Sequence, residues 1–129
     1  MKITIPIPPR TKKNSQRIVM IKGRPVPLPS KEYKEYEKAC APFIPRLKVP
    51  ISEPVNVKCL YYMPTRRRVD LTNLLEATAD LLVTYKVLAD DNRNVMYAVD
   101  GSRVFYDKER PRCEIEIEPM KEIERWTND

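Results

Sequence analysis

The chain has 129 residues, contains no histidine and carries a formal net charge of +6, from 24 Lys and Arg against 18 Asp and Glu. This length suits one domain with one hydrophobic core. The missing histidine excludes a Ser-His-Asp triad, a Cys-His nucleophile pair and a zinc site with imidazole ligands. Any hydrolysis must therefore use carboxylates, lysine, tyrosine or metal-bound water, and a protein that is not an enzyme stays open.

Membrane and secretory features are absent from the sequence pattern. No apolar run approaches the roughly 20 residues of a membrane span, and the first residues lack the apolar stretch of a signal peptide. The three cysteines are scattered and form no CxxC pair, which predicts reduced core residues rather than a zinc site. We expect a cytoplasmic protein that makes no membrane contact.

The positive charge is concentrated at the beginning of the chain. Residues 1–48 carry twelve Lys and Arg against three Glu, whereas residues 113–129 carry two against six acidic residues. A basic first third predicts a polyanion partner such as nucleic acid. The alternative is that these charges only keep the protein soluble.

The first half of the chain is rich in proline. Residues 2–8 alternate like a strand, and their prolines make it an edge strand or mark its end. A polar basic loop follows at 10–17, then a strand at 17–21, a turn and an extended proline-rich run at 25–29. Ser30 is placed to cap a helix over 31–44.

The second half alternates strands with one strong helix. We predict strands at residues 55–63, 95–99, 103–106 and 113–117 and a helix over 71–85, with a domain at 1–119 and a fraying polar tail at 120–129. The helix has an apolar stripe formed by Leu71, Leu74, Leu75, Thr78, Leu81 and Leu82, and a separate face formed by Asp70, Asn73, Glu76, Ala77 and Asp80.

Basic and acidic residues meet at the start of this helix. Arg66, Arg67 and Arg68 lead into Asp70, and the pair Asp90-Asp91 follows the helix. Arginines hold phosphates and clustered carboxylates hold magnesium. Asp70 also stands where a helix cap belongs, and Asp90-Asp91 is typical of a turn. Since strand-to-helix junctions of α/β sheets hold ligands, we expect both acidic groups to meet at one rim.

The pattern Arg67-Arg68-x-Asp70-Leu71-x-Asn73-Leu74, followed by a helix to about Asp80 and then Asp90-Asp91, resembles the RusA-type Holliday junction resolvases. The resemblance covers most of the chain. It implies a compact single α/β (α+β) domain with a mixed sheet and two main helices. It also implies a homodimer that uses Mg²⁺, with Mn²⁺ possible, to cut branched four-way DNA, and a prophage or phage origin.

Carried over residue by residue, Asp70 matches the first catalytic aspartate of the family, Asp91 the last and Asp90 its acidic neighbour, while Asn73 and Asp80 match helix positions. Two positions depart. Where the family has a second aspartate this chain has Thr72, and where it has a helix lysine this chain has Glu76.

The departures allow two interpretations. Glu76 lies one turn after Thr72, so its carboxylate can replace the missing aspartate. A cation such as Lys86, Arg103 or Lys108 would then replace the lysine. Alternatively, the site has decayed and the protein only binds junctions or other nucleic acid.

These arguments give the expected site. The catalytic residues are Asp70, Asp91 and Glu76, and the metal ligands are these three with Asp90. The alternative for each charge run is a solvated surface, and for the whole protein a structural or interaction role. The residues expected to bind DNA are Arg10, Lys12, Lys13, Arg17, Arg66, Arg67, Arg68, Asn73, Arg103 and Lys108.

Overall fold

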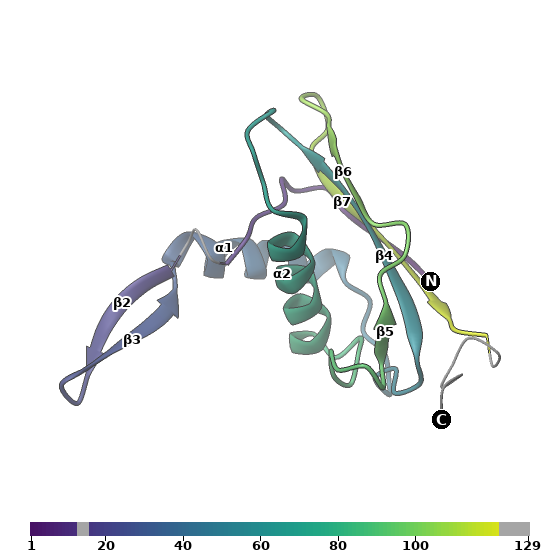
Figure 1. Ribbon diagram of the computed structural model, residues 1–129, viewed down its shortest axis with the longest axis horizontal. Helices are drawn as coiled ribbons and strands as arrows, with labels where there is room; N and C mark the ends of the chain where they lie inside the picture. Colours follow the sequence, from purple (N-terminus) through teal and green to yellow (C-terminus); the bar gives the residue numbers. More distant parts are fainter. Residues whose placement is uncertain (13–15, 122–129) are drawn as a thin grey trace.

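The structure is a computed structural model that describes residues 1–12 and 16–121. Its two helices lie on the same face of one mixed sheet, and a separate hairpin projects from this body (Figure 1). The elements in chain order are β1 (Lys2–Ile5), β2 (Gln16–Ile21), β3 (Arg24–Pro29), α1 (Lys31–Cys40), a 3-10 turn (Ala41–Phe43), β4 (Val55–Met63), α2 (Leu71–Thr84), β5 (Met96–Ala98), β6 (Arg103–Tyr106) and β7 (Arg112–Pro119).

The main sheet is built around β4. Its strand order is β1-β7-β4-β5, and β6 pairs with the second half of β4. β7 runs antiparallel to β1 and β4, whereas β5 and β6 run parallel to β4. The expected single α+β domain with a mixed sheet and two helices is confirmed, and β1 is an edge strand, one of the two interpretations of its prolines.

Alternation along β4 produces the core. Val57, Cys59 and Tyr61 point toward the helices and are at most 1% exposed. The hydroxyl groups of Tyr61 and Thr78 form a buried hydrogen bond of 2.7 Å, which fixes α2 against β4. The three cysteines are buried and free, as predicted.

The polar face predicted for α2 needs one correction. Ala77 was placed with Asn73 and Glu76, but it is only 2% exposed and packs in the core. The apolar contact of α2 is wider than the leucine stripe, because Ala77 lies beside Leu74 and Leu81 and is small enough to lie close to the sheet. The remaining element boundaries agree with the sequence within a few residues. The largest difference is α1, which ends at Cys40 in a 3-10 turn.

The hairpin of β2 and β3 is apolar on both of its faces. Ile18 and Met20 are 66% and 64% exposed on one face, and Ile21 on the other face is 46% exposed. A two-stranded ribbon has no second layer of its own against which to bury such side chains. We call the segment 16–29 the arm.

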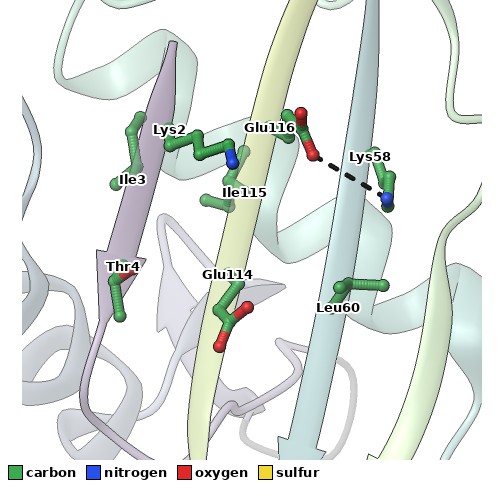
Figure 2. A pocket seen from close by; sticks show the side chains of 8 residues that line it. All are labelled: Lys2, Ile3, Thr4, Lys58, Leu60, Glu114, Ile115 and Glu116. Carbon is green, nitrogen blue, oxygen red and sulfur yellow. Dashed lines mark ion pairs between the residues drawn. The ribbon is translucent and has the colours of Figure 1, made fainter.

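The sheet face away from the helices is polar around Lys58, Glu114 and Glu116. Glu114 and Glu116 of β7 alternate with buried Ile115, so the strand predicted over residues 113–117 has one acidic face. Figure 2 shows this face, where the Lys58 ammonium lies 3.7 Å from the Glu116 carboxylate. Opposite charges on neighbouring strands thus offset one another there, so this part of the sheet does not form a one-signed surface.

Candidate nucleic-acid and metal site

Asp70 begins α2 as its N-cap. Its Oδ1 accepts hydrogen bonds from the Thr72 backbone N–H at 2.9 Å and from the Thr72 hydroxyl at 2.5 Å. Both residues are solvent-exposed. The cap that the sequence offered as an alternative is therefore present. It also gives Thr72 a role, because its hydroxyl orients the carboxylate of Asp70.

A groove lies beside this helix start. It is bounded by residues 8–11 on one side and by residues 63–69 on the other, and encloses about 380 Å³. Arg10 and Arg67 both line it. Two arginines and the amino end of a helix at one groove are a suitable environment for a phosphate group. The fold thus brings together Arg10 and Arg67, which belong to loops far apart in the sequence.

The other two arginines of the run have different surroundings. The guanidinium of Arg66 stacks on Tyr106 of β6 at 4.2 Å from the ring centroid. Arg68 is solvent-exposed. The stacking gives Arg66 a fixed position while leaving the edge of its guanidinium available for hydrogen bonds.

The basic loop before β2 is only partly described. Lys12 forms an ion pair of 2.7 Å with Asp80 and lies 5.8 Å from the centroid of the Tyr33 ring. Its charge is therefore offset within the protein, which weakens its expected role in binding DNA. Lys13 lies outside the described residues, and for Arg17 the structure describes only its backbone in β2.

Asp90 and Asp91 lie in the turn between α2 and β5. The Asp91 N–H donates to Asp90 Oδ1 at 2.7 Å, and both side chains are exposed. Partial removal from water, a hydrogen bond with Asp90 and the negative charges of Asp90 and Asp80 raise the pKa of Asp91 above its ordinary value. The negative charges of Asp90 and Asp80 thus act on Asp91, which favours a cation in this turn.

The expected meeting of Asp70 and Asp91 at one rim does not occur within one chain. Asp70 follows the last residue of β4, whereas Asp91 precedes Met96, which pairs with Val55 at the first residue of β4. The 14 residues of α2 span about 21 Å and return the chain to the opposite end of the sheet. Figure 1 shows the segment after α2 at the end of the helix remote from the 64–70 loop.

Among the described residues of one chain, the carboxylates are not grouped into a metal site. Carboxylate oxygens are the donors that Mg²⁺ prefers. Within residues 1–12 and 16–121, however, no three Asp, Glu or Cys side chains are grouped so that they could hold a metal ion. Glu76 is exposed on α2 between the two acidic ends, and Asn73 is half-buried in the first helical turn.

The three candidate replacements for the family lysine lie in different places. Lys86 lies just beyond α2, at the end remote from Asp70, with a left-handed φ of 60°. Arg103 is exposed on β6, and Lys108 is exposed in the turn after it. Since β6 pairs with the last residues of β4, Arg103 and Lys108 share the end of the sheet from which the chain proceeds to Asp70.

Sequence analysis missed an aromatic group on the strand that carries Arg103. Tyr62 of β4 stacks on Phe105 of β6, and the guanidinium of Arg112 covers the Tyr62 ring. The sequence predicted a strand over residues 103–106, but it did not predict which side chains of other strands lie beside it. Only the register between β4, β6 and β7 shows that the three side chains form one row.

The fold and these groups define a small α+β protein with a basic groove at the amino end of its main helix, a class suited to binding nucleic-acid phosphates. The sequence matches the family Endodeoxyribonuclease RusA over residues 6–118. The chain therefore belongs to the RusA endodeoxyribonucleases, which resolve Holliday junctions, and the resemblance noted in the motif is confirmed. Among curated proteins no match was found. No helix in the described ranges is long and apolar enough to cross a membrane.

Proposed function

We propose that this protein is a homodimeric, Mg²⁺-dependent endonuclease that cuts four-way DNA junctions, with Mn²⁺ able to substitute. The observation that carries the proposal is the groove lined by Arg10 and Arg67 beside the exposed carboxylate of Asp70. It combines phosphate-binding groups with a hard oxygen ligand at one place. The expected prophage or phage origin belongs to the same proposal.

The separation of the acidic ends supports a dimer. A second copy related by a two-fold axis can place the amino end of its α2 beside the Asp90-Asp91 turn of the first copy. Asp70 of one chain and Asp91 of the partner subunit would then complete one site, and symmetry would complete a second. Two equivalent sites are also what symmetric cutting of two strands requires.

The residues of this chain would have distinct tasks in such a site. Arg10 and Arg67 would hold the phosphate backbone, and the Thr72 hydroxyl would keep the Asp70 carboxylate oriented. A bound Mg²⁺ would supply charge neutralisation at the phosphate and activation of water. Binding and orientation of the DNA strand would remain with the arginines.

The competing proposal is a protein that binds junctions without cutting them, because Thr72 and Glu76 replace two family residues. Incubation of labelled four-way junction, duplex and flap DNA with increasing Mg²⁺ separates the two. The nuclease requires metal for product and prefers the junction. Salt-sensitive binding to all three with no product at any Mg²⁺ or Mn²⁺ concentration would support the binding protein instead.

The arginine run gives a test of DNA contact. Replacing Arg66, Arg67 and Arg68 together by Ala is expected to weaken binding to every DNA form, because each lost phosphate contact lowers the slope of log affinity against log salt by roughly 0.9. Titrations at several salt concentrations measure this slope. Lys48→Ala, which removes a charge in the segment before β4 that does not line the groove, is the control. An unchanged slope in the triple variant would make these arginines a solvated surface.

Glu76 gives a test of the departure from the family. If its carboxylate has replaced the missing aspartate, Glu76→Gln is expected to reduce cleavage nearly as much as Asp70→Asn, while Thr72→Ala has a smaller effect. Single-turnover cleavage at saturating Mg²⁺ measures all three. Glu35→Gln on exposed α1 is the matched control. Normal cleavage by Glu76→Gln would leave Glu76 as a helix-surface residue.

A further inference from the structure

Three side chains from three strands form a continuous stack on the sheet face away from the helices. The Arg112 guanidinium lies 3.7 Å from the centroid of the Tyr62 ring. On β6, the Phe105 ring lies 5.1 Å from Tyr62 between centroids, with 19° between the ring planes. The order Arg112, Tyr62, Phe105 follows the strand order β7, β4, β6, so the stack runs across the sheet toward its edge.

The inner end of this stack is held rigidly. Arg112 donates hydrogen bonds to Asp107 at 2.9 Å and to Glu114 at 2.7 Å, and also to the Arg110 carbonyl at 2.9 Å. These acceptors fix the guanidinium plane and with it the orientation of Tyr62. They also neutralise Arg112, so its role is to support the rings rather than to attract an anion.

The outer end of the stack faces solvent. β6 has β4 as its pairing partner within the described part of the chain, and all four of its residues are exposed. The Phe105 side chain is 40% exposed although its ring packs on Tyr62. A planar group placed on Phe105 would continue the row at an ordinary stacking distance.

The charges around Phe105 favour a polyanion that carries such planar groups. Arg103 lies two residues earlier on the same face of β6, whereas Arg66 stacks on Tyr106, which lies on the opposite face of the same strand. The strand is tied to the end of β4 through the Asp107 N–H, which donates to the Met63 carbonyl at 2.9 Å. The stack therefore lies at the end of the sheet that leads into the basic groove.

We propose that Phe105 is a stacking platform for an unpaired nucleobase of the bound DNA, with Arg103 contacting the adjoining backbone. A rigid aromatic surface beside arginines is the arrangement that binds single-stranded nucleic acid without reading its sequence. At a four-way junction the base at the branch point is the one that most easily leaves its stack. The inference rests on the proposed DNA substrate, but it requires neither the metal nor cleavage.

The affinity test uses full-length protein in EDTA, so that binding is measured without cutting. Phe105→Leu keeps the apolar bulk but removes the ring face. It is expected to lose roughly ten- to one-hundredfold in affinity for junctions and single strands, with little change for paired duplex. Val104→Ala is the matched control, because Val104 is 37% exposed on the opposite face of the same strand. Equal losses on duplex and junction, or an equal loss in Val104→Ala, would overturn the proposal.

A second measurement detects the contact itself. The Phe105→Trp protein is titrated with a junction that carries 5-bromouracil at the branch point, which quenches an indole only on contact. Quenching beyond that of the wild-type protein, whose one tryptophan reports the background, is expected. The same base within a paired arm should not quench. Equal quenching by both DNAs would show that Phe105 does not select an unpaired base. Loss of self-association in Phe105→Leu, measured by sedimentation, would show that Phe105 contacts another protein chain instead of DNA. If the wild-type protein does not cut junctions, both measurements can still be made, because neither depends on cleavage.

Discussion

Mixing the Asp70→Asn protein with the Asp91→Asn protein is expected to restore junction cleavage that neither protein has alone. If each site takes Asp70 from one chain and Asp91 from its partner, a mixed dimer contains one intact site and one doubly altered site. Subunit exchange at equal concentrations should therefore recover about a quarter of the wild-type sites, and each should cut one strand and leave a nicked junction. If native mass spectrometry detects mixed dimers but no nicking occurs, the shared site is wrong.

Each variant alone is expected to lose cleavage by roughly a thousandfold or more, since metal-assisted charge stabilisation is among the largest contributions to catalysis. Junction binding should persist, because removing negative charge does not weaken attraction to phosphate. Asparagine caps helices about as well as aspartate, so Asp70→Asn should fold normally. Near-normal cleavage by both variants would remove Asp70 and Asp91 from the site.

The raised pKa of Asp91 predicts how Asp91→Asn changes stability, so a loss of cleavage can be distinguished from a loss of folding. Because the folded state favours the protonated carboxyl, the contribution of Asp91 to stability is present at low pH and is lost as pH rises through its folded-state pKa. Asp91→Asn removes a charge that is repelled by Asp90 and Asp80. Its melting temperature at pH 7 is therefore expected to equal or exceed that of the wild type, although its cleavage is lost.

Converting Ile18 and Met20 of the arm to Asp is expected to produce a monomer of about 15.2 kDa that cannot cut junctions symmetrically. Ile18 and Met20 are 66% and 64% exposed in one chain, and we expect the proposed dimer to bury them, so that charges there weaken self-association by roughly a hundredfold or more. Sedimentation at micromolar concentration, with and without junction DNA, measures the mass.

The control for the arm is Val49→Asp. Val49 is 76% exposed in the segment between α1 and β4, outside the arm, and its substitution should weaken self-association much less than the arm substitutions do. A wild-type protein that sediments as a monomer under both conditions would contradict the dimer directly. A dimer that survives the arm substitutions would place the interface elsewhere and leave the arm without this role.

Local signals in the sequence were sufficient for most of the fold. Alternation predicted β4 over Val55–Met63, and Ser30 and Asp70 both cap the helices that follow them, because these patterns depend on neighbours along the chain. Pairing of β2 with β3 was not predicted. Prolines at alternate positions indicate extended chain, but they say nothing about which strand will lie opposite.

The candidate site was less accessible from sequence, because it depends on distances across the fold. The acidic ends of α2 were expected together, yet a helix that returns alongside β4 separates them by its own length. The ion pair of Lys12 with Asp80 and the row of Arg112, Tyr62 and Phe105 likewise join residues far apart in the chain. Their contacts follow from the order of strands in the sheet, which the hydrophobic periodicity of a sequence does not predict.

The edge of β4 is shared by two short strands, and the gap between them is closed by side chains. Asn56 exchanges hydrogen bonds of 2.8 and 3.1 Å with the Asp100 backbone, and Ser102 Oγ accepts from the Cys59 N–H at 3.0 Å. These side chains replace ladder bonds where the strand pairing is interrupted. The two short strands are thus held to β4 by separate sets of bonds, so we expect β6 to open while β5 remains paired, which would appear as faster amide exchange in β6 than in β5.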